Sequence, residues 1–132
     1  MKQIYILIAF LFLTFINLNA QITDVVTGVG CPQILLEKNN KLYMALNDGA
    51  RISKIDMTIS SPAAKLVRTG IAEVSGMVLV GNDLYFTRRI LGNISKIDIT
   101  TTSPTVIDVA TGFTAPGDLH ISGNYIYASD VF

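Results

Sequence analysis

Beyond an apolar stretch at its start, the chain consists of short hydrophobic runs separated by polar turns. Each run is rich in Ile, Val, Leu, Tyr or Thr and is bounded by Gly, Asn, Asp, Ser or Pro, which is typical of β-strands. No run shows an apolar period of ~3.6 residues long enough for a helix. The pattern predicts strands at Ile34–Glu37, Lys41–Leu46, Ile52–Met57, Ala64–Arg68, Gly76–Val80, Asp83–Thr87, Ile94–Ile99, Thr105–Val109, Asp118–Ser122 and Tyr125–Ser129.

These strands recur at a constant spacing along the chain. Ile52-Ser53-Lys54-Ile55-Asp56 returns as Ile94-Ser95-Lys96-Ile97-Asp98, and segments 30–71 and 72–113 are identical at 14 of 42 aligned positions. A third copy, 114–132, is truncated. The period of about 42 residues lies within the range of ~20–50 that marks repeat architecture. Four strands per period, joined by short turns, predict an all-β fold of four-stranded antiparallel sheets, arranged as the blades of an incomplete β-propeller.

Several predicted strands are apolar on both faces, including 42–46, 77–80 and 84–86. Continuous apolar runs indicate burial on both sides, so the sheets should stack face to face. Tyr43 and its equivalent Tyr85 should then be buried between neighbouring sheets, each with its hydroxyl reaching a polar partner. A stack of about two and a half units would leave apolar faces and strand edges open, which favours self-association.

The links between paired strands carry residues that suit tight hairpins. Asn39-Asn40, Gly81-Asn82-Asp83 and Gly123-Asn124 occupy equivalent places in the three units. Asn and Gly tolerate the positive φ that two-residue hairpin turns require. Because all three units share them, the asparagines are interpreted as turn residues. Upstream, Val25-Val26-Thr27-Gly28 matches Val67-Arg68-Thr69-Gly70, which suggests the tail of a preceding unit.

Residues 1–20 have the layout of a secretory signal peptide. Lys2 precedes an apolar run from Ile4 to Ile16, and a short polar region ends at Ala20. This is the order of the n-, h- and c-regions, and the apolar run is shorter than the ~20 residues of a membrane-spanning helix. We therefore expect cleavage before Gln21 and a protein that is secreted to the periplasm, outer surface or medium. An uncleaved membrane anchor is the alternative.

The charge balance and the single cysteine limit the kinds of molecule that the protein is expected to bind. Without Lys2 the chain has nine Lys and Arg against ten Asp and Glu. This balance argues against nucleic acid or an acidic membrane surface as a partner. The one cysteine, Cys31, has no intramolecular partner. A buried thiol is the favoured interpretation, and an intermolecular disulfide is the alternative.

With Leu-Tyr and Ile-Ser-Lys-Ile-Asp at this spacing, the chain resembles the broad six-bladed β-propeller group. That group includes NHL repeats, YWTD repeats, and the gluconolactonase-like and virginiamycin B lyase-like enzymes. Leu84-Tyr85-Phe86-Thr87 looks like a degenerate Leu-Tyr-Trp-Thr-Asp in which Arg88 replaces the Asp, whereas Tyr127-Ala128-Ser129-Asp130 keeps the Asp and lacks the Trp. The resemblance covers residues 25–132 and implies a fold more than an activity. The signal style is similar to that of secreted bacterial proteins.

The resemblance also implies where a ligand would bind, because propellers bind at the mouth of the central channel, near their innermost strands. Here those segments are Cys31–Glu37, Glu73–Leu79 and Ala115–Ile121, and the candidate ligand-binding residues are Glu73, Asp118 and His120. Other polar residues available there are Gln33, Glu37 and Ser75.

In gluconolactonase-like enzymes a Glu, an Asn and an Asp surround a divalent cation. Glu73 matches the first of these, and no matched Asn and Asp follow. The Pro-His-Gly of the lyase-like enzymes is also broken here, because His120 comes four residues after Pro116. Each of these residues therefore has a plain structural interpretation, as a solvated carboxylate or a strand histidine.

Two classes of function follow. The favoured one is a secreted, non-catalytic propeller that binds a protein or glycan or acts as a scaffold, with no cofactor. The alternative is part of a propeller enzyme, a metal-dependent lactonase using Ca²⁺ or Zn²⁺ or a lyase, whose site further blades complete. The sequence contains no nucleophile elbow, zinc-spaced cysteines or phosphate loop.

Overall fold

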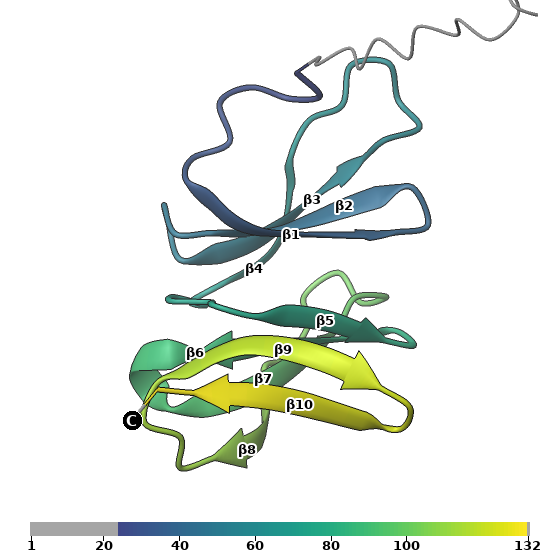
Figure 1. The fold of residues 1–132 in the computed structure, drawn as a ribbon. Helices are drawn as coiled ribbons and strands as arrows, with labels where there is room; N and C mark the ends of the chain where they lie inside the picture. Colours follow the sequence, from purple (N-terminus) through teal and green to yellow (C-terminus); the bar gives the residue numbers. More distant parts are fainter. Residues whose placement is uncertain (1–23, 132) are drawn as a thin grey trace, which may run out of the picture.

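A computed structural model describes residues 24–131, and these residues form an all-β fold. Two four-stranded antiparallel sheets and one two-stranded sheet follow one another along the chain (Figure 1). The strands are β1 (Pro32–Lys38), β2 (Lys41–Leu46), β3 (Arg51–Asp56), β4 (Lys65–Thr69), β5 (Met77–Val80), β6 (Asp83–Arg88), β7 (Asn93–Asp98), β8 (Ile107–Thr111), β9 (Pro116–Ser122) and β10 (Tyr125–Asp130). The all-β prediction and its four-stranded antiparallel sheets are thus confirmed.

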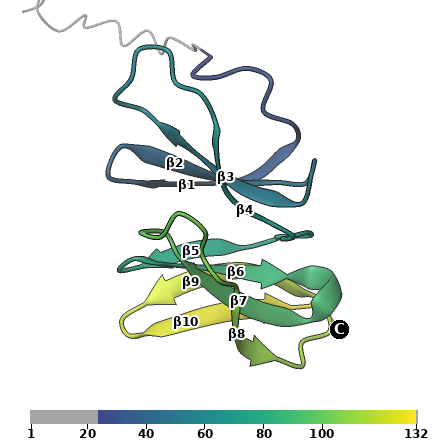
Figure 2. The ribbon, with the colours of Figure 1, turned by 180° about the vertical axis from the view of Figure 1, so that it is seen from behind.

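Each sheet is a meander in which sequential strands are neighbours. The order is β1-β2-β3-β4 in the first sheet, β5-β6-β7-β8 in the second, and β9 paired with β10 in the third. The sheets lie on one another as layers, with the second between the first and third, and both views show the same stacking (Figures 1 and 2). Each predicted strand is present, and most strands begin or end a few residues away from the predicted position.

The hairpin turns have the geometry that their sequences predict. Lys38 pairs with Lys41 across Asn39-Asn40, and both asparagines have positive φ, 51° and 58°. Gly81 and Gly123 take the corresponding first place in the other two hairpins, with φ of 59° and 57°. Glycine carries no Cβ penalty in this region, and Asn has the smallest penalty of the common residues, so these turns form at little cost.

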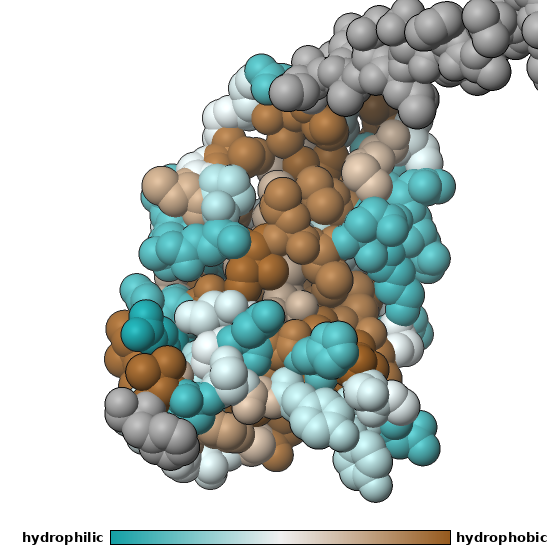
Figure 3. Space-filling view, viewed as in Figure 1, coloured by the Kyte–Doolittle hydropathy of each residue, from teal (hydrophilic) through white to brown (hydrophobic). Residues whose placement is uncertain are grey.

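The main hydrophobic core lies between the first two sheets. Tyr43 and Ile52 from the first sheet pack with Phe86 and Ile97 from the second. A smaller core between the second sheet and the β9–β10 hairpin contains Val78, Ile94 and Leu119. Figure 3 shows apolar residues along the middle of the visible face over the first two sheets, with hydrophilic residues on both sides. The two-sided apolar strands are therefore explained by stacking.

The outer face of the first sheet is also covered in part. Met44, Leu46 and Ile55 are buried there, and Val26 and Val29 from the segment before β1 pack against them. This segment and the connection from β3 to β4 both lie over this face (Figure 1). Residues 25–28 form no strand. The match to the end of a repeat unit therefore does not give them the strand structure of 67–69, which belong to β4.

Burial of the repeated tyrosine falls along the stack. Tyr43 is 4% exposed and lies between the first and second sheets. Tyr85 is half-buried and packs between the second sheet and the β9–β10 hairpin. Tyr127, at the equivalent position of the third unit, is 57% exposed. Each tyrosine faces the unit that follows it in the chain, so its burial depends on how much of that unit packs against it. Burial is confirmed for Tyr43 and is only partial for Tyr85.

The second unit contains a feature that the strand pattern does not predict. A 3₁₀ turn at Arg89–Leu91 links β6 to β7 and ends at Gly92, whose φ is 62°. The first unit has Asn47-Asp48-Gly49 in the same place, so this connection differs between units while the flanking strands agree. Within the described residues, no helix is long and apolar enough to cross a membrane.

Candidate functional site

The predicted inner strands do come together. β1 contacts β5, and β5 in turn contacts β9, so the first strands of successive sheets form one row. Gly76, just before β5, lies so close to β9 that an added Cβ would be 2.6 Å from the backbone nitrogen of Leu119 and 2.7 Å from the carbonyl oxygen of Gly117. A glycine is required at this contact, because a side chain would collide with backbone that has no room to move.

Glu73 lies in the loop that enters β5. Its φ is 55°. This left-handed conformation is strained for a residue other than glycine, at a cost of ~1–2 kcal/mol. Its carbonyl oxygen accepts a hydrogen bond of 3.0 Å from the amide of Arg89, which helps to hold this conformation. The half-buried residue lines a small hollow together with Gln33, Asn47 and other residues. Backbone strain of this kind often occurs at functional sites.

Asp118 and His120 lie close together on β9 and are both exposed. The carboxylate of Asp118 accepts a 2.8 Å hydrogen bond from the amide of Leu119, and its own amide donates to the Ser129 hydroxyl at 2.9 Å. His120 pairs across the hairpin with Tyr127. Neither residue lines the hollow beside Glu73, so two of the three candidate residues share a strand face and the third lies apart.

In residues 24–131 no group of three or more His, Cys, Asp and Glu side chains has the arrangement of a metal site. The binding roles of Glu73, Asp118 and His120 stay predictions. The expectation of a buried thiol is wrong, because Cys31 is exposed. It lies just before β1, where its carbonyl oxygen accepts a 3.1 Å hydrogen bond from the amide of Asn47, and the intermolecular alternative stays open.

The repeated Asp and Thr after the Ile-Ser-Lys-Ile stretch form a structural turn. Asp98 Oδ1 accepts hydrogen bonds from the amide and the hydroxyl of Thr100, at 2.8 and 2.6 Å, and Asp56 and Thr58 form the same pair. These bonds stabilise the ionised carboxylate and lower the pKa of Asp98 and of Asp56 below its usual value. The motif that dominates the repeat therefore specifies how each third strand ends.

The sequence pattern did not predict a second repeated feature, in which a side-chain hydroxyl accepts hydrogen bonds from backbone amides. The Thr87 hydroxyl accepts hydrogen bonds from the amides of Ser75 and Gly76, at 3.0 and 2.9 Å, and the Ser129 hydroxyl accepts one from Asp118 in the next unit. These hydroxyls satisfy backbone donors near the start of the first strands of the second and third units, whereas the first unit has Ala45 at the equivalent position. The signal available was the hydroxyl residue shared by Phe86-Thr87 and Ala128-Ser129, which occupy equivalent positions of the repeat.

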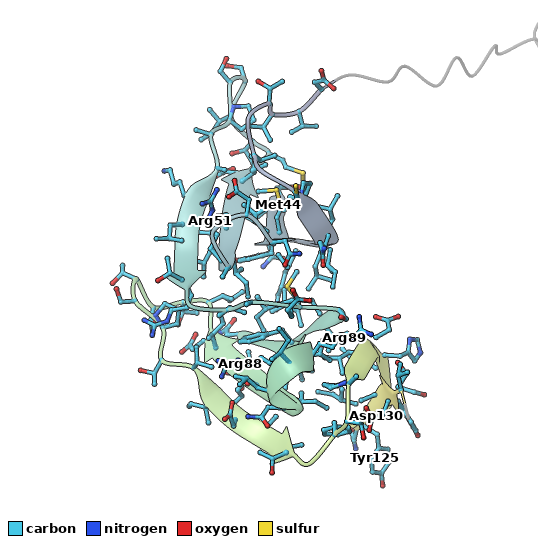
Figure 4. The ribbon with its side chains drawn as sticks, turned by 90° about the vertical axis from the view of Figure 1, so that its left-hand side faces the viewer. Met44, Arg51, Arg88, Arg89, Tyr125 and Asp130 are labelled. Atoms are coloured by element: carbon cyan, nitrogen blue, oxygen red, sulfur yellow. The ribbon has the colours of Figure 1, made fainter. Side chains whose placement is uncertain are left out.

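Asp130, the Asp of the YWTD-like pattern, fixes the loop before β9. Its carboxylate accepts hydrogen bonds from the amides of Thr114 and Ala115, at 3.0 and 2.7 Å, which lower its pKa. Figure 4 shows Asp130 and Tyr125 on the third sheet, with Tyr125 projecting away from the stack. The second unit has Arg88 at the place of Asp130, and its NH1 lies 3.6 Å from Asp108 Oδ1.

No model of a known protein family matches the chain, and no curated protein matches it. Among solved structures, it is similar to the crystal structure of the computationally designed Ika8 protein, with a TM-score of 0.57 and 13% sequence identity. The match covers 75% of this chain and 30% of the designed protein, so the matched part spans less than a third of that protein's length. At this identity the likeness shows the fold alone.

Proposed function

We propose that the chain is a β-propeller-type repeat protein that acts outside the cytoplasm as a binding or scaffold module for a protein or glycan. The observation that carries the proposal is the repeated contact between the first strands β1, β5 and β9 of successive sheets. Sheets of meandering strands that meet along their first strands are the building plan of a propeller. The proposed location rests on the signal-like pattern of residues 1–20, which lies outside the described residues.

The surface at the end of the stack supports a role in binding. Asp118 and His120 on β9, and Tyr125 and Tyr127 on β10, are all exposed. The two tyrosine rings meet edge to face, with centroids 6.4 Å apart. Tyrosine offers a large rigid contact area with a polar tip, and it is enriched where proteins bind partners. This surface also contains two of the three residues that the sequence suggested.

The experiment compares binding with catalysis in one preparation. The protein is applied to arrays of immobilised glycans and extracellular proteins, and the same sample is assayed for hydrolysis of a lactone in Ca²⁺ or Zn²⁺. We expect saturable binding that Tyr127→Ser weakens and that Ile59→Ser leaves unchanged. Ile59 is the matched control because it is apolar and 49% exposed, in the connection from β3 to β4. Metal-dependent hydrolysis that Glu73→Gln abolishes would instead establish the enzyme alternative.

A further inference from the structure

The second sheet contains a carboxylate that side chains of two other strands hold in place. Asp108 on β8 accepts hydrogen bonds from the side-chain amide of Asn93, at 2.9 Å, and from the Ser95 hydroxyl, at 2.5 Å. Both donors lie on β7. A guanidinium nitrogen of Arg88, on β6, lies 3.6 Å from Asp108 Oδ1. The donors of this cluster are therefore arranged around one carboxylate.

The first sheet keeps the hydroxyl of this cluster and lacks the carboxylate. In the second sheet Ser95 pairs with Asp108 at a bulge. In the first sheet Ser53 pairs with Leu66 at the equivalent bulge. The register is the same at this point, so the first sheet has an isobutyl group where the second has an acid. Ser53 is buried, as Ser95 is, but its partner on the neighbouring strand cannot accept a hydrogen bond.

The first sheet also keeps a guanidinium at this place, on the neighbouring strand. In the second sheet Arg88 on β6 pairs with Asn93 on β7. In the first sheet Leu46 on β2 pairs with Arg51 on β3. Figure 4 labels both arginines. Within residues 24–131, Arg51 forms no ion pair, not even with Asp48 nearby in the chain. The first sheet thus has a cation and a hydroxyl at this place without the acid that they would hold.

A cavity of about 380 Å³ lies at this place in the first sheet. Arg51 and Ser53 contribute polar groups to its lining, and Val29, Leu46 and Leu66 contribute apolar walls. Leu66 is 57% exposed, whereas Ser53 is buried, so the cavity extends from solvent to the face of the sheet. Pockets for small molecules have volumes of roughly 300–1,000 Å³, with apolar walls and a few polar groups that orient the ligand. This cavity has both properties.

We propose that this cavity binds a small aliphatic carboxylate, whose acid group takes the place that the Asp108 side chain has in the second unit. The hydroxyl of Ser53 and the guanidinium of Arg51 donate hydrogen bonds to the carboxylate, and bonds to an ionised acceptor are stronger than those between neutral groups. The alkyl chain of the ligand packs against Leu46 and Leu66 and removes their apolar surface from water. The second unit supplies its own acid and needs no ligand.

The probe is isovalerate, a branched aliphatic acid. It is titrated at constant ionic strength into the isotope-labelled full chain and followed through the amide resonances of Ser53 and Leu66. We expect saturable shifts at both amides, with a Kd of about 1 mM or below. Two analogues separate the parts of the ligand: 3-methylbutanol lacks the carboxylate, and glucuronate has the carboxylate on a polar ring. Each should bind at least about tenfold more weakly than isovalerate.

Two variants of the protein test the assignment, each with a matched control. Leu66→Asp gives the first sheet the acid of the second and should abolish binding, because the new carboxylate occupies the donors. Leu66→Asn removes the same apolar wall without adding a charge, and should weaken binding by about tenfold or less.

The second variant, Arg51→Gln, removes the cation and should weaken binding at least about tenfold. Lys54→Gln removes a cation from the same strand, at a position that does not line the cavity, and should bind as the parent does. The test therefore does not depend on Leu66→Asp folding.

The proposal is overturned if isovalerate causes no shift at about 10 mM, where a Kd of about 1 mM would give nearly full occupancy. It is also overturned if Arg51→Gln, or a folded Leu66→Asp, binds as the parent does, since binding then occurs elsewhere. Glucuronate that binds as tightly as isovalerate would assign the cavity to an acidic sugar and would likewise contradict it. None of these results bears on lactone hydrolysis or on binding at the β9–β10 surface, so the two proposals are tested separately.

Discussion

Replacement of the repeated tyrosine by alanine in each of the three units tests the stacking directly. Tyr43, Tyr85 and Tyr127 have the same place in their units and differ in what covers them. The three substitutions remove the same atoms from the same kind of strand. Differences in their effect on the free energy of unfolding therefore report the neighbouring sheet.

The expected costs follow from exposure. Tyr43 is 4% exposed, so Tyr43→Ala loses nearly a whole buried aromatic ring and should destabilise by about 3–5 kcal/mol. Tyr127 is 57% exposed, and its removal should change stability by less than about 0.5 kcal/mol. Tyr85 is half-buried and should fall between them, at about 1–3 kcal/mol.

Urea unfolding at constant protein concentration, followed by circular dichroism, measures the three values. Tyr43→Phe serves as the matched control, because it keeps the ring and should cost less than about 1.5 kcal/mol. Equal costs at the three positions, or a larger cost at Tyr127 than at Tyr43, would refute the inference that each tyrosine is covered by the unit that follows it.

Four further outcomes can be measured. Gly76→Ala should loosen the β9–β10 hairpin, seen as faster amide exchange at Leu119, because its Cβ would lie 2.6 Å from that nitrogen; unchanged exchange would contradict the close approach. Glu73→Gly should raise stability by about 1 kcal/mol in urea unfolding through relief of the left-handed backbone, and a loss would show that the carboxylate contributes to folding. The pKa of Asp130 lies below its usual 3.8 in the folded state, so its contribution is present above that pH and is lost as pH falls through the folded value; Asp130→Asn should flatten the acid side of a pH–stability curve. Burial raises the pKa of Tyr43 above 10.0, so stability should be constant below that pH and fall as pH rises past it, and Tyr43→Phe should reduce this fall.

The strands and their order could be predicted from the sequence because both depend on the local pattern of turn residues and apolar runs. Asn39-Asn40 and Gly81 specify tight turns, and the constant repeat period aligns units whose strands confirm one another. Short apolar runs between such turns have few alternatives to a meander. The 3₁₀ turn at Arg89–Leu91 was missed because it lies where the two units differ, so the repeat gives no guide there.

The candidate site was less predictable, for a physical reason. Whether Glu73 lies beside Asp118 depends on how successive sheets are placed, and no local pattern encodes this placement. Exposure of Cys31 likewise depends on which edge of the sheet its segment borders. The hydroxyl of Thr87 and the carboxylate of Asp130 hold backbone amides of other loops, and such partners become visible only in three dimensions.

The two faces of each sheet are different, and this has a consequence for how such a chain can change in length. Tyr43 faces forward along the stack, whereas Phe86, from the following unit, faces back toward it. At each interface between the described sheets, the face that one sheet turns toward the next unit packs against the face that the next sheet turns toward the preceding unit. Duplication or deletion of one whole repeat unit would create a junction of the same kind as those already present, whereas a cut at any other length would break the pairing. A whole repeat unit can thus be added or removed without changing which residues pack between neighbouring sheets.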